Sequence, residues 1–138
     1  MFEQPSTGGA TMMLWTVVMW VGRVLVAVFF LMSAYNHLSN SAMMAGYAQS
    51  KGVPMARVSV IVTGLMMLAG GLSVLTGWHA TYGVALLVLF LVPTALIMHN
   101  YWTVPDPMAK MGERINFWKN ITIAGSLLLY AAALHHAY

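Results

Sequence analysis

Cysteine is absent from this sequence, and charged residues are scarce. The lack of cysteine excludes thiol nucleophiles, disulfides, thiolate metal sites and covalent haem attachment. Only 7% of the residues are charged, against about 25% in an average soluble domain. A water-soluble fold needs a polar surface, so a composition that is 60% hydrophobic indicates a membrane protein.

Acidic residues number only three, against six lysines and arginines. None of the three lies inside a long apolar run, which argues against a proton-coupled exporter, because such a protein needs a titrating carboxylate on its transport path. The net charge of +3 rests mostly on two short loops, so it concerns membrane orientation and anionic lipid. We therefore expect a lipid bilayer, and no nucleic acid, as the partner.

Four apolar segments of about twenty residues have the length that crosses roughly 30 Å of hydrocarbon as a helix. They lie near residues 14–36, 57–77, 79–99 and 116–135. The first is too long for a signal-peptide core, so we expect it to remain as a span. The expected fold is all-α, a four-transmembrane-helix bundle, with no linker inside it. Its domains are an outer N-terminal tail, 1–13, and a single four-span membrane domain, 14–138.

Two further helix signals lie in the connections. Residues 39–54 have capping residues at the start and glycine and proline at the end, which predicts a short interfacial helix between the first and second spans. The side chains expected to face lipid are Met43, Met44 and Tyr47. Asp106 as an N-cap and Pro107 at the first helical position predict where the last helix begins.

The basic residues give the orientation. Five of the six lie on one side of the four predicted spans, namely Lys51, Arg57, Lys110, Arg114 and Lys119. By the positive-inside rule, loops 38–56 and 100–115 are cytoplasmic and both termini lie outside. We expect a multi-pass protein of a bacterial-type cell (inner) membrane.

Polar side chains converge at the predicted inner ends of the spans. His37 ends the first span, His99 ends the third and is followed by Trp102, and the fourth enters with Lys119 and Asn120. Each alone is an ordinary interfacial residue. Together they suit a quinone, because imidazole and ammonium donors can bond its two carbonyls and Trp102 can flank its ring. These five residues are the candidate cofactor-binding site.

Other ligands are less favoured. A b-type haem between His37 and His99 is the rival cofactor, but both residues lie too near the membrane surface for a buried macrocycle. We expect no metal site, because Asp106 is the only candidate carboxylate and capping explains it. Pro93 frees the carbonyl of Leu89 and bends the third span, either as a packing kink or as an opening for a ligand.

Arg23 is the one charge inside a span, where a charge costs at least roughly 2.5–3.5 kcal/mol. One interpretation is that it extends toward the outer surface beside Trp20 and gains a cation–π contact. The other is that it points inward to serine, threonine or tyrosine, or to the acid of a partner subunit. Arg23 is thus a candidate structural or partner-binding residue.

Several short motifs make the chain resemble the DoxX family of small four-span membrane proteins. They are Gly22-Arg23-Val24-Leu25, Asn36-His37-Leu38, Lys51-Gly52-Val53-Pro54, Gly70-Gly71-Leu72-Ser73, Phe90-Leu91-Val92-Pro93-Thr94, His99-Asn100-Tyr101-Trp102, Asp106-Pro107 and Phe117-Trp118-Lys119-Asn120. The resemblance implies a four-helix bundle and a role linked to membrane redox chemistry. It transfers no established set of catalytic residues.

Two functions remain open. One is a membrane subunit linked to respiratory redox chemistry that places a quinone at the inner-face cluster. The other is a non-catalytic accessory or scaffold subunit of a larger membrane complex, for which thirteen methionines would provide adaptable contacts. Other membrane redox subunits or a second copy of the chain are the expected protein partners, and the sequence does not decide whether the chain is an enzyme.

Overall fold

A computed structural model describes residues 7–136, which form five α-helices and one short 3-10 helix, without a strand in that range. The elements are α1 (Thr7–Ser39), α2 (Ser41–Ser50), α3 (Ala56–Thr76), α4 (Ala80–Met98), η1 (Tyr101–Thr103) and α5 (Pro107–His136). Four helices are long and apolar enough to cross a membrane. This confirms the predicted four-span all-α fold with a short helix between the first and second spans.

The helix ends differ from the predicted spans mainly at the first and last helices. α1 begins at Thr7, inside the stretch predicted to be a tail, and residues 1–6 of that tail lie outside the described residues. α5 begins at Pro107, and the Asp106 carboxylate accepts a hydrogen bond from the Ala109 backbone N–H at 2.8 Å. The predicted N-cap is thus confirmed, and it adds two turns ahead of the apolar run.

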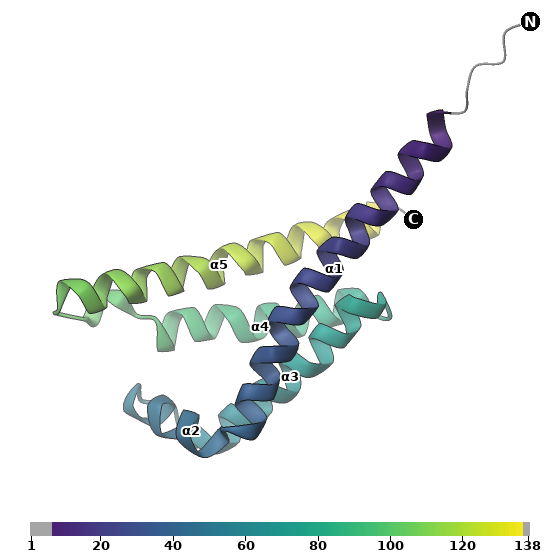
Figure 1. Cartoon of the computed structure of the whole chain (residues 1–138). Helices are drawn as coiled ribbons and strands as arrows, with labels where there is room; N and C mark the ends of the chain where they lie inside the picture. Colours follow the sequence, from purple (N-terminus) through teal and green to yellow (C-terminus); the bar gives the residue numbers. More distant parts are fainter. Residues whose placement is uncertain (1–6, 137–138) are drawn as a thin grey trace, which may run out of the picture.

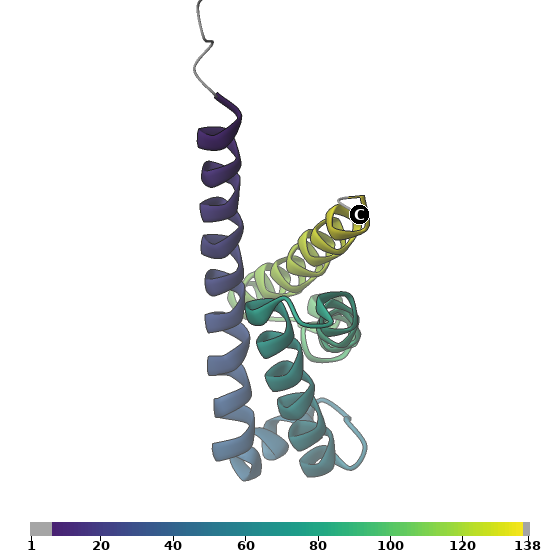
Figure 2. The same ribbon diagram turned by 90° about the vertical axis from the view of Figure 1, so that its right-hand side faces the viewer.

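The long helices form two antiparallel pairs, α1 with α3 and α4 with α5 (Figure 1). A tight turn joins α3 to α4, and these two helices also pack together. α2 lies at the end of the molecule that holds the connection from α4 to α5, which we call the basic end because Lys51, Arg57, Lys110 and Arg114 lie there. The N-terminal part of α1 extends past the other helices (Figure 2).

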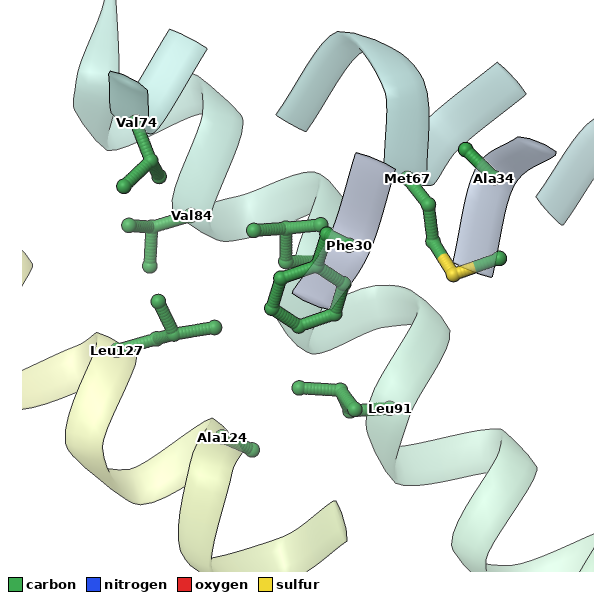
Figure 3. Packing of buried hydrophobic residues seen from close by; sticks show 9 residues of the cluster. Phe30, Ala34, Met67, Val74, Val84, Leu91, Ala124 and Leu127 are labelled. Atoms are coloured by element: carbon green, nitrogen blue, oxygen red, sulfur yellow. The ribbon is translucent and has the colours of Figure 1, made fainter. Parts of the chain in front are cut away.

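The core lies where the two pairs meet (Figure 3). Phe30 of α1 and Met67 of α3 are fully buried against Leu87 and Leu91 of α4. α5 contributes smaller contacts to this core through Ala124 and Leu127.

Glycines allow α3 to approach both of its neighbours. Gly64 and Gly71, seven residues apart, both face α1, where an added Cβ would meet Leu38 at 3.0 Å and Leu31 at 3.2 Å respectively. Gly70 faces α4, and a Cβ there would lie 2.6 Å from Leu87. In lipid such close backbone contact replaces the hydrophobic effect as the force between helices.

Arg23 joins three elements at the end opposite α2. Its Nε donates to the Tyr130 hydroxyl at 3.2 Å, which links α1 to α5. The guanidinium also lies 5.3 Å from the Trp20 ring centroid and packs beside Gly77 in the turn between α3 and α4. Both expected contacts of Arg23, the tryptophan ring and an inward tyrosine, therefore occur together.

Candidate functional site

A cavity of about 690 Å³ opens between the helices toward the basic end. All five α-helices contribute to its lining, and most of the side chains are apolar, including Phe29, Met44 and Phe90. Pro93 and Leu89 of α4 also line it. α4 continues through Pro93, which has no N–H to donate, so the Leu89 carbonyl without its helical partner lies in the cavity wall.

Four of the five predicted site residues line this one cavity, and they are His37, His99, Lys119 and Asn120. Trp102 is not among the lining residues. It lies in η1, where its ring packs edge-on against Tyr101 at 5.3 Å and Phe117 at 5.7 Å between ring centroids. α4 ends at Met98 and the chain changes direction before Trp102, so helical spacing from His99 no longer places that ring.

His37 is held by its own helix. Its Nδ1 lies 2.9 Å from the Ser33 backbone oxygen, and because a carbonyl only accepts, Nδ1 carries the hydrogen. The ring meets Phe90 of α4 edge-on, with 6.0 Å between centroids. Nε2 has no partner within residues 7–136 and remains available to a ligand.

Asn120 is the buried polar residue of the site. Its side chain is 6% exposed, lines the cavity and makes no hydrogen bond to any residue that the structure describes. Neighbouring Lys119 donates to the Asn116 amide oxygen at 3.2 Å, which leaves further N–H groups of its ammonium free to bind. The amide atoms of Asn120 are open to the cavity, since the only fully buried unpaired side-chain atom among the described residues is Asn100 Oδ1. Asn120 therefore offers both a donor and an acceptor to a ligand.

Glu113 is a site residue that the sequence analysis missed. Its Oε2 accepts from His99 Nδ1 at 2.7 Å, and its Oε1 accepts from the Tyr47 hydroxyl at 3.3 Å and lies 3.9 Å from Lys51 Nζ. One carboxylate thereby joins α2, α4 and α5. Glu113 lies in the helix predicted from Pro107 but ahead of the span predicted from residue 116, and it was not considered for the site. It is seven residues before Asn120 and hence near the same helix face.

The predicted surface of α2 also needs correction. Met43, Met44 and Tyr47 were expected to face lipid, and all three contribute to the cavity lining, although Met43 remains 73% exposed and Tyr47 48% exposed. The Tyr47 hydroxyl turns to α5, and burial, together with the charge and hydrogen bond of Glu113, raises the pKa of Tyr47. α2 therefore covers one side of the cavity.

The family and its relatives agree with this architecture. The DoxX family model matches residues 18–100, more than half of the chain. The Escherichia coli inner membrane protein YphA is 28% identical over 115 residues, covering 83% of this chain and 81% of the relative. The E. coli inner membrane protein YqjF is 26% identical over 118 residues, covering 86% and 85%. No solved structure matches the chain. The chain belongs to the DoxX family.

Proposed function

We propose that this chain is a quinone-binding subunit of a bacterial inner membrane. The observation that carries the proposal is the unpaired amide of the largely buried Asn120, which opens onto a mostly apolar cavity that His37, His99 and Lys119 also line. The inner-membrane location is supported by the names of the two E. coli relatives. The predicted orientation, with both termini outside, would put the cavity near the cytoplasmic side.

The size and lining of the cavity support this ligand class. Its volume of about 690 Å³ falls within the roughly 300–1,000 Å³ of small-molecule pockets, which are mostly apolar with a few orienting polar groups. The rings of Phe29 and Phe90 would contact the face of the head group and the first isoprenoid units. The N–H groups of Lys119 and Asn120 would donate to its oxygens, and His37 Nε2 would accept from a hydroxyl of the reduced form.

His99 and Glu113 have a different proposed part. His99 lines the cavity while its Nδ1 is fixed by Glu113, whose side chain is 19% exposed. The pair would therefore connect the head group to the basic end and hold the ring of His99 in one orientation. Electron donors and acceptors would be partner subunits of the same membrane.

Ligand binding tests the proposal directly. Detergent-purified protein is titrated with decylubiquinone and, separately, with decylubiquinol, and the bound fraction is measured by extraction and absorbance. We expect Asn120→Leu to bind decylubiquinone about tenfold more weakly, because the carbonyl oxygen loses an N–H donor, and His37→Leu to bind decylubiquinol more weakly by a similar factor, because a hydroxyl of the reduced form loses its acceptor.

Two exposed residues supply matched controls. His135→Leu and Asn40→Leu remove the same side chains from positions outside the cavity and should bind like the unchanged protein. Absence of binding, or equal binding by all five proteins, would refute the quinone site. The accessory-subunit function would then be the one to pursue, by identifying proteins that copurify with the chain.

A further inference from the structure

We infer that the cavity selects the hydroxyl-bearing, reduced form of its ligand, a quinol over the corresponding quinone. This inference rests on the proposed function and names the chemical form that the site takes. Its basis is the number of hydrogen-bond donors and acceptors in the wall that α1 and α3 form.

His37 supplies the first acceptor. Its Nδ1–H is committed to the Ser33 carbonyl at 2.9 Å, so the neutral imidazole has only the lone pair of Nε2 to offer. A quinone carbonyl is also only an acceptor and would gain nothing from this atom. A quinol hydroxyl can donate to it.

Three hydroxyl groups of the same wall are acceptors for the same reason. Ser33 donates to the Phe29 carbonyl at 2.8 Å, Ser59 to the Pro54 carbonyl at 2.9 Å, and Thr63 to the Ser59 carbonyl at 2.8 Å. Each hydroxyl has one hydrogen, and here it is directed to the backbone. Only their lone pairs remain for a ligand.

α4 and α5 complete the pattern. The Leu89 carbonyl adds an acceptor, because Pro93 cannot donate to it. Lys119 is a donor, and Asn120 and Thr94 can serve either way, with all three residues lining the cavity. A quinol can donate its hydroxyl hydrogens to the acceptors of the α1 and α3 wall and accept hydrogen bonds from the donors of α5. A quinone can only accept from the donors of α5, so the acceptors of the α1 and α3 wall gain no hydrogen bond from it.

The test compares the two forms of one probe. Decylubiquinol and decylubiquinone are titrated separately into the purified full-length chain under argon, and the two dissociation constants are measured. We expect the quinol to bind about fivefold more tightly, the effect of one additional hydrogen bond. The His37→Gln variant presents an N–H donor as well as an acceptor, so its preference should fall toward unity through tighter quinone binding.

Further variants make each outcome decisive. Ser33→Ala removes one acceptor without adding a donor and should weaken quinol binding alone, and His135→Gln, at an exposed position, should leave the preference unchanged.

If neither form binds, the proposed function fails and the inference with it. If both forms bind equally, or the quinone binds more tightly, the inference is overturned while the proposed function stands. A quinol preference that survives in His37→Gln and Ser33→Ala would overturn the acceptor wall as its cause.

Discussion

Asn120 has an energetic cost in the unliganded chain. The residue is 6% exposed and its amide, which opens onto a mostly apolar cavity, has no hydrogen-bond partner in the described residues. A polar group in such a setting destabilises the fold relative to an apolar side chain of similar shape. We predict that Asn120→Leu raises the free energy of unfolding by about 1 kcal/mol. Thermal unfolding in detergent, followed by circular dichroism, measures this change.

The same variant should therefore be more stable while binding quinone more weakly. This combination separates a lost binding group from a misfolded chain. Asn40→Leu, at an exposed position, should change stability little. A lower unfolding temperature for Asn120→Leu would mean that the amide has a structural partner instead.

Individual residues show how far the site could be predicted. His37 and Asn120 lie in regular helix, so their depth and face follow from helical spacing, and the structure brings both to the cavity. Trp102 lies beyond the end of α4, where helical spacing no longer indicates which way a side chain points. Glu113 was overlooked because hydropathy ends a span where apolar residues end, although the α5 helix continues.

At the scale of elements, Glu113 acts as a latch for α2. It receives hydrogen bonds from Tyr47 and His99 and lies 3.9 Å from Lys51 Nζ. We predict that Glu113→Gln weakens this attachment by about 1.5–3 kcal/mol, the range for hydrogen bonds to a charged group. Amide hydrogen exchange should then become faster in α2 and stay unchanged in the middle of α3.

Tyr47 gives the latch a second readout. Its raised pKa means that the folded chain holds the phenol proton more tightly than the unfolded chain. The bond to Glu113 is thus fully present below about pH 10 and lost as the pH rises through the raised pKa. In Glu113→Gln, Tyr47 should ionise at lower pH, as tyrosinate absorbance of this variant with and without Tyr47→Phe can show.

A neighbouring charge provides the control for the latch. Arg114→Gln changes an exposed residue of the same helix and should alter neither the exchange of α2 nor the titration of Tyr47. If Glu113→Gln behaves like Arg114→Gln in both measurements, α2 is held by its contacts with α3 and not by the carboxylate.

The elements themselves were largely predictable because lipid imposes few choices. Apolar runs of bilayer length indicate the four spans. The seven-residue spacing of Gly64 and Gly71 puts both on one helix face, which the structure places against α1. The relative inclination of the two helix pairs was not predictable. It depends on how side chains such as Phe30 and Leu87 fit together in three dimensions, and the pattern of residue types along the sequence does not specify this fit.

At the scale of the whole molecule, the orientation in the membrane decides which compartment the basic end faces. The start of α1 and the end of α5 lie away from α2 (Figure 1), and the positive-inside rule predicts that α2 is on the cytoplasmic side. Because the chain has no cysteine, a single introduced cysteine can report the side of the membrane on which it lies, without labelling of other thiols in the chain.

We predict that His136→Cys reacts with a membrane-impermeant maleimide in intact spheroplasts, whereas Ser50→Cys reacts only after lysis. Both positions are exposed, so accessibility within the fold cannot cause the difference. The reverse pattern would place Glu113, the basic end and the cavity that opens toward it on the external side of the membrane.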